Sequence, residues 1–161
     1  MREDLAEMPN GQTTIYGVVE SGECVGVLPF LEDDRVVMVR QYRYAFGEDQ
    51  RWEMPTGGVK KGESLMEAAH RELREEVGYD ASELQYVNTY FPSKSIMHEI
   101  AHLYLGRGLS RVHAVPDETE FMEVADFPFN KVLQMVLDSE IRDSMTVIAV
   151  LLADRLRRNG N

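Results

Sequence analysis

The stretch "GGVKKGESLMEAAHRELREEVGY", residues 57–79, joins a glycine-rich loop to a helical pattern that ends in acidic residues. Ser64 followed three residues later by Glu67 has the spacing of a capping box, which marks the start of a helix. Gly78 is a typical C-terminal stop. The pattern therefore predicts a helix over about 65–77.

Three glutamates lie near the end of this helix. At about 100° per residue, Glu72 and Glu76 fall inside an arc that is otherwise apolar, with Glu75 at its edge. Inward-facing carboxylates cost several kcal/mol unless they are paired or bound to a cation. One interpretation is a solvated acidic face bridged by Arg71 and Arg74. The other, which the apolar arc favours, is a site for Mg²⁺ or Mn²⁺, whose preferred ligands are hard oxygens.

The loop before the helix supports a ligand site. Gly57 and Gly58 carry no side chain, so their backbone can approach a ligand closely and offer a carbonyl or an amide. Most glycine-rich loops are only turns. Followed by this acidic helix, however, the loop indicates a binding site.

Composition limits the possible partners. The chain has 161 residues, enough for one domain with a sizeable core, and a formal net charge of −11 without a basic stripe. This charge disfavours nucleic acid as a partner. Cys24 is the single cysteine, and neither a membrane-spanning run nor a signal-peptide core is evident, so we expect a cytoplasmic protein that does not bind membranes.

The rest of the chain alternates strand and helix patterns without a repeat or linker, which predicts one domain over 1–161. A turn at 9–11 separates two short N-terminal extended pieces. Further strands are expected at 13–20, 23–30, 33–44, 84–91, 99–106 and 120–127, and C-terminal helices at 129–140 and 144–158. The irregular order predicts an α+β protein or an α/β/α sandwich with a mixed sheet.

The 57–79 stretch resembles the signature of the Nudix hydrolases, G-x5-E-x7-R-E-U-x-E-E-x-G-U, where U is a bulky aliphatic residue. The last position holds Tyr79, a departure that affects packing rather than chemistry. The positions that match are Gly57, Glu63, Arg71, Glu72, Leu73, Glu75, Glu76 and Gly78.

The resemblance implies a Nudix-type fold and metal-dependent hydrolysis of a nucleoside diphosphate linked to another group. By this resemblance, Glu72 and Glu76 would hold the metal, with Glu75 as a further ligand or a supporting group. The backbone carbonyl of Thr56 would also reach a metal. Arg71 would orient the glutamates, and Glu63 would belong to the supporting frame.

Features outside the signature resemble the ADP-ribose pyrophosphatase group. "WEMPTGG" at 52–58 is similar to its segment before the signature. "VRQYRY" at 39–44 is similar to its strand ending Q-x-R, and by this resemblance Arg43 would contact a substrate phosphate. "PDETEFMEV" at 116–124 is similar to its acidic loop, in which Glu118 or Glu120 would be the catalytic base or a metal ligand.

Two further residues are weaker candidates, and the substrate remains open. The loop at 90–99 matches that group imperfectly, and Glu99 in it would help bind a metal or a ribose, or be a strand-edge charge. The strands within about 1–22 would pair in a homodimer, with Tyr16 either stacking on a nucleobase or packing within the sheet. Alternatives are a Nudix enzyme for GDP-mannose or a nucleoside triphosphate, a non-catalytic ADP-ribose sensor, and a structural metal-binding protein.

Overall fold

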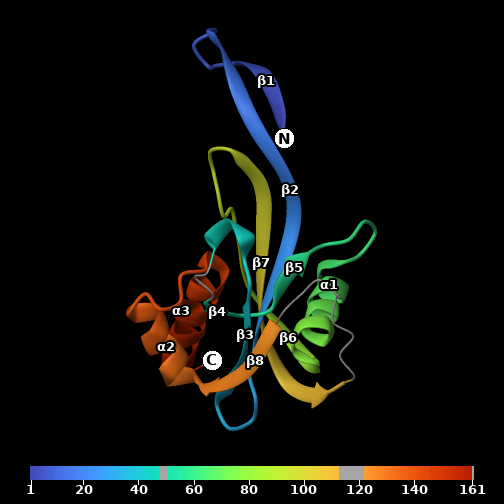
Figure 1. Cartoon of the computed structure of the whole chain (residues 1–161), viewed down its shortest axis with the longest axis vertical. Coiled ribbons are helices and arrows are strands. Elements are labelled where there is room, and N and C mark those ends of the chain that lie inside the picture. Colours follow the sequence, from blue (N-terminus) through green and yellow to red (C-terminus); the bar gives the residue numbers. More distant parts are fainter. Residues whose placement is uncertain (48–50, 113–121, 161) are drawn as a thin grey trace.

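A computed structural model describes residues 1–47, 51–112 and 122–160. Helix α1 lies on one side of the strands and helices α2 and α3 on the other, which is the predicted α/β/α sandwich with a mixed sheet (Figure 1). The strands are β1 (Arg2–Glu7), β2 (Thr13–Pro29), β3 (Arg35–Gln41), β4 (Trp52–Glu53), β5 (Thr56–Gly58), β6 (Tyr79–Tyr90), β7 (Met97–Arg111) and β8 (Met122–Pro128). The helices are α1 (Leu65–Glu72), α2 (Phe129–Leu137) and α3 (Ser144–Arg158), with short turns at Tyr44–Phe46 and Leu73–Val77.

The strands form two sheets. The larger has the order β1-β2-β7-β6, with β5 pairing to β2, and the smaller has the order β4-β3-β8. Strands β2 and β7 run parallel, whereas the other pairs are antiparallel, so the larger sheet is mixed. Strand β5 pairs with residues 24–26 in the second half of β2, and it contacts α1, so the glycine-rich loop lies next to this helix.

The N-terminal hairpin projects from the rest of the molecule (Figure 1). It is formed by β1 and the first part of β2, joined by the turn predicted at 9–11. The prediction of separate strands at 13–20 and 23–30 was wrong, because they form the single strand β2. Gly22, with φ of 82°, lies at a register shift against β7, so the backbone bulges there instead of turning.

Two hydrophobic clusters cover the faces of the sheets. One packs α1 against Val25, Val27 and Tyr104, and the other packs α2 and α3 against Leu28 and Leu103. Side chains that alternate along β2 thus enter different clusters, as the two-residue period of a strand requires. Among the described residues, no helix is both long and apolar enough to cross a membrane.

The acidic helix begins as predicted. Ser64 Oγ accepts a hydrogen bond from the Glu67 N–H, and the Glu67 carboxylate accepts one from the Ser64 N–H, completing the capping box. The predicted end at 77 is correct, but the last turn, Leu73–Val77, is a π-helix rather than an α-helix. It ends at Gly78, which has the left-handed conformation expected of a stop.

Candidate functional site

The three glutamates line one cavity of about 330 Å³ between α1, its π-turn and β5. Eight of the residues predicted for the site lie on its walls, together with Lys60, which was not predicted. The lining consists of Arg43, Thr56, Gly57, Gly58, Lys60, Arg71, Glu72, Glu75 and Glu76. The structure therefore brings the loop and the acidic turn together.

The helix presents two of its carboxylates inward. Glu72 is 7% exposed and Glu76 is 6% exposed, on the side of the helix that also buries Ala69 and Leu73. A π-turn adds a residue to the helical turn, and such turns are frequent at functional sites. The predicted inward placement of Glu72 and Glu76 is confirmed.

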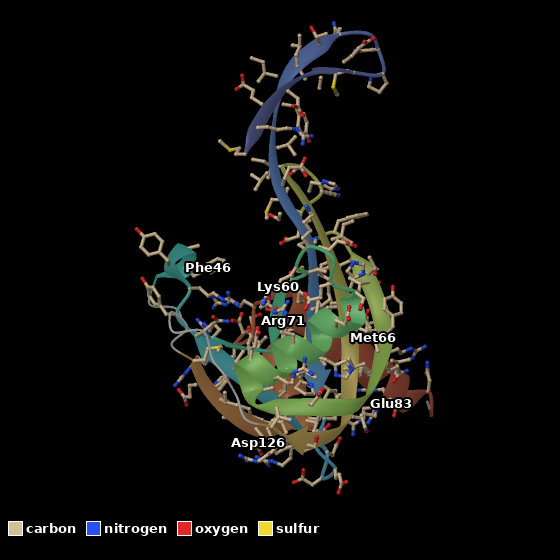
Figure 2. The ribbon with its side chains drawn as sticks, turned by 90° about the vertical axis from the view of Figure 1, so that its right-hand side faces the viewer. Phe46, Lys60, Met66, Arg71, Glu83 and Asp126 are labelled. Atoms are coloured by element: carbon tan, nitrogen blue, oxygen red, sulfur yellow. The ribbon has the colours of Figure 1, made fainter. Side chains whose placement is uncertain are left out.

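Arg71 holds the acidic residues in position. Its Nε and Nη2 donate to the two oxygens of Glu63 at 2.8 and 2.9 Å, and its Nη1 donates to Glu72 and, at 3.0 Å, to Glu75. Nη2 also donates to the Gly58 carbonyl at 2.8 Å, which ties the helix to the loop. Figure 2 shows Arg71 between α1 and the loop that carries Lys60.

The charges in this network stabilise one another. Hydrogen bonding to Arg71, followed by the N–H of Lys60, lowers the pKa of Glu63 to about 2. The same Glu63 bonds, and then those to Glu72 and Glu75, raise the pKa of Arg71 above its ordinary value. Arg71 and Glu63 thus form an ion pair beside the glutamates, and the orienting role that the resemblance implies for them stays a prediction.

The glycine-rich loop is in close contact with the buried carboxylates. A Cβ atom on Gly57 would lie 2.0 Å from Glu72 Oε1, so only glycine fits there without displacing the carboxylate. One residue earlier, the Thr56 N–H donates to Glu76 Oε2 at 3.1 Å. Glu72 and Glu76 are therefore both fixed against β5.

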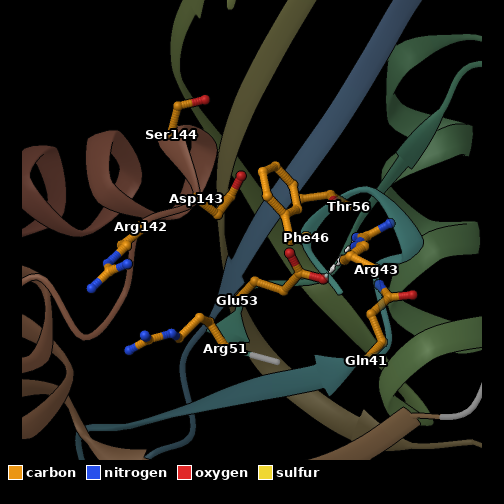
Figure 3. Close-up of a pocket in the computed structure, with 9 residues that line it drawn as sticks. All are labelled: Gln41, Arg43, Phe46, Arg51, Glu53, Thr56, Arg142, Asp143 and Ser144. Carbon is orange, nitrogen blue, oxygen red and sulfur yellow. Dashed lines mark hydrogen bonds and ion pairs between the residues drawn. The ribbon is translucent and has the colours of Figure 1, made fainter. Parts of the chain in front are cut away.

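Arg43 joins this cavity to a second one of about 640 Å³. Its Nε and Nη2 donate to Glu53 Oε1 at 3.0 and 2.7 Å. Burial raises the pKa of Glu53, and the charge of Arg43 opposes that effect. Figure 3 shows Arg43 on one side of this second cavity, with Arg51 and Arg142 on the other.

The donor types at the acidic cavity fit a hard divalent cation. Its three carboxylates and nearby backbone oxygens are the ligands that Mg²⁺ and Mn²⁺ prefer. Within the described ranges, however, no three His, Cys, Asp or Glu side chains are arranged so that they could hold a metal ion. The guanidinium of Arg71 lies among the carboxylates instead, bonded to both Glu72 and Glu75.

Other predicted residues lie elsewhere. Tyr16 and Glu99 line neither cavity, and the Tyr16 hydroxyl donates to the Ser95 carbonyl. Burial raises the pKa of the Cys24 thiol to about 11, and the nearby charge of Glu99 adds to this effect. Glu118 and Glu120 lie outside the described residues.

Two contacts near the site were not predicted. His70 is half-buried, and its Nδ1 is hydrogen-bonded to Asp80 at the start of β6. The partner of Arg43 was not predicted either. Glu53 is ten residues further along and reaches Arg43 because β3 and β4 pair in antiparallel register, a contact that short-range spacing does not reveal.

Comparison with known proteins identifies the family. The sequence model of the NUDIX domain matches residues 20–146. The chain belongs to the Nudix family. This chain is a Nudix pyrophosphohydrolase, and the matched range includes all the residues that line the acidic cavity.

Similar proteins cover most of this Nudix chain. The methanol dehydrogenase activator of Bacillus methanolicus is 37% identical over 149 residues, which are 91% of this chain and 80% of that protein. The ADP-ribose pyrophosphatase of Bacillus subtilis is 33% identical over 146 residues, 89% of this chain and 78% of that one. A crystal structure of an ADP compounds hydrolase is 23% identical to this chain and superposes on it with a TM-score of 0.85. The match covers 96% of this chain and 84% of that one, so the two share a fold.

Proposed function

We propose that this Nudix hydrolase cleaves the pyrophosphate of ADP-ribose or a related nucleoside diphosphate sugar. The products would be a nucleoside monophosphate and a sugar phosphate. The observation that carries the proposal is the pair of buried carboxylates, Glu72 and Glu76, fixed against a glycine-rich loop. The name and high coverage of the Bacillus subtilis relative support ADP-ribose as the first substrate to test.

A divalent cation would make such an acidic site compatible with an anionic substrate. Glu72 and Glu76 would hold Mg²⁺ or Mn²⁺, with Glu75 and the carbonyl of Thr56 as further ligands. When bound, the cation would activate water and neutralise phosphate charge. Arg71 would then keep its bonds to Glu63 and hold the helix in the same orientation toward β5.

The chain itself supplies the remaining groups. The guanidinium of Arg43 lines both cavities and would bind a phosphate oxygen, while its bonds to Glu53 fix its direction. Glu118 or Glu120 would accept the proton of the attacking water, which requires only hydrogen-bond reach. Glu99 would contact a ribose hydroxyl or a metal.

The projecting hairpin would form a homodimer interface. Leu5 and Ile15 are register partners on it and are 75% and 67% exposed, an apolar pair suited to a second copy of the chain. In such a dimer Tyr16 would stack on the nucleobase held by the partner. Light scattering tests this point: Leu5→Glu with Ile15→Glu is expected to convert dimer to monomer, and a wild-type monomer would contradict it.

A substrate panel tests the proposed activity. Wild-type protein is incubated with ADP-ribose, GDP-mannose and a nucleoside triphosphate, each with Mg²⁺, Mn²⁺ or a chelator, and the products are separated chromatographically. We expect AMP and ribose 5-phosphate from ADP-ribose, at the highest kcat/KM, and no turnover with the chelator. Preferential triphosphate cleavage would contradict the substrate assignment.

The acidic loop is tested separately. Glu118→Gln and Glu120→Gln are compared at saturating ADP-ribose, and we expect one variant to lose far more of its kcat than the other, because a single group accepts the proton. Equal, small losses would show that neither glutamate acts in the reaction.

A further inference from the structure

The second cavity lies directly beside the acidic one. It has a volume of about 640 Å³ and shares Arg43 and Thr56 with the acidic cavity. A substrate whose pyrophosphate lies at the glutamates would therefore extend one of its two arms past Arg43 into this space. Which arm it takes depends on the chemistry of the walls.

Phe46 is the aromatic side chain on these walls. It lines the cavity, yet it is 74% exposed. Among the residues that the structure describes, its ring makes no stacking or cation–π contact. Figure 3 shows the ring and the Arg43–Glu53 pair among the side chains that line the cavity. The other described residues on the walls are polar or charged, so the Phe46 ring is the large apolar side chain that could cover an apolar, planar group.

The backbone holds Phe46 at a fixed place relative to Arg43. The Phe46 N–H donates to the Arg43 carbonyl at 2.9 Å, and the Gly47 N–H donates to the Tyr44 carbonyl at 3.3 Å. Gly47 has φ of 64°, a left-handed conformation that closes this tight turn. Arg43 is itself anchored on Glu53. One turn therefore presents a cation and an aromatic ring together.

We propose that the second cavity receives the nucleoside arm of the substrate and that Phe46 stacks on its nucleobase. This inference rests on the proposed function, because it places the pyrophosphate between the glutamates and Arg43. A nucleobase has a π-face that an aromatic ring can stack on, whichever base it is, whereas a sugar has none. Phe46 would thus contribute to substrate binding rather than to the chemical step.

The two arms can be distinguished by the products that contain them. AMP and GMP each consist of a base, a ribose and a phosphate, whereas ribose 5-phosphate has a ribose and a phosphate but no base. Binding of each to wild type, Phe46→Ala, Phe46→Trp and Tyr44→Ala is measured by calorimetry at one fixed Mg²⁺ concentration. Tyr44 is the matched control, because it is an aromatic residue of the same turn, is 89% exposed and does not line the cavity.

We expect Phe46→Ala to weaken the binding of AMP and GMP about ten-fold, which is the scale of one lost base–aromatic stack. Phe46→Trp and Tyr44→Ala should stay within about two-fold of wild type, and ribose 5-phosphate should bind all four proteins equally. Three results would overturn the proposal: unchanged AMP binding in Phe46→Ala, an equal loss in Tyr44→Ala, or weaker ribose 5-phosphate binding in Phe46→Ala. Product binding requires no turnover, so failure of the proposed hydrolysis would be seen separately, in the substrate panel.

Discussion

Gly57 and Glu72 approach each other so closely that a Cβ atom on the glycine would lie 2.0 Å from the carboxylate oxygen. Gly57→Ala should therefore push Glu72 out of its place against β5. We expect kcat for ADP-ribose to fall at least about ten-fold, as misplacing a catalytic group by about 1 Å commonly costs more than that.

The matched control for this variant is the next residue. A Cβ atom on Gly58 would meet nothing within 4 Å, and alanine keeps the carbonyl that Arg71 uses. Gly58→Ala should thus retain most of its kcat in the same assay. Similar losses of kcat in the two variants would show that the close contact between Gly57 and Glu72 does not cause the loss in Gly57→Ala.

Arg71 is expected to be irreplaceable by lysine. Its guanidinium spans Glu63 on one side and Glu72 and Glu75 on the other, whereas an ammonium is a point charge without this fork. Arg71→Lys should lower kcat by at least about ten-fold, because the glutamates lose their common orientation. Kinetics with ADP-ribose and Mg²⁺ measure the loss.

Arg74→Lys provides the comparison on the same helix. Arg74 is more exposed than Arg71 and contacts Asp80 at 3.1 Å, away from the acidic cavity. It should keep near wild-type kcat. If Arg71→Lys were as active as Arg74→Lys, positive charge alone would be sufficient and the fork would have no role.

The pair of Glu63 and Arg71 should make stability depend on pH. The folded-state pKa of Glu63 is about 2, below its ordinary 4.5, so the contribution of its charge is complete above about pH 4.5 and is lost as pH falls toward 2. Glu63→Gln should therefore be less stable than wild type at neutral pH, with the difference shrinking below about pH 4.5. Urea unfolding from pH 6 to pH 3 tests this, and a difference independent of pH would contradict it.

Sequence alone predicted the features that depend on local spacing. The capping box of Ser64 and Glu67, the stop at Gly78 and the inward side of Glu72 and Glu76 all follow from contacts within one or two turns. The family signature then predicted that the glutamates and the glycine-rich loop lie together at one cavity.

Features that depend on long-range packing were missed. The bulge at Gly22 looks like a turn in sequence, and it continues the strand because β7 pairs on both sides of it. His70 is covered because β6 brings Asp80 to it, and Arg43 is paired because β4 brings Glu53 to β3. None of these pairings has a signal in the spacing of the residues involved.

The measurement that tests the central claim most directly is the rate of ADP-ribose hydrolysis by Glu76→Gln across a Mg²⁺ titration. Glu67→Gln, on the same helix, is the control, because glutamine also serves in a capping box. If the buried carboxylates seat the activating cation, Glu76→Gln should fold normally and lose at least about 100-fold in kcat, while Glu67→Gln stays near wild type. Full activity of a correctly folded Glu76→Gln, with an unchanged Mg²⁺ requirement, would contradict the account.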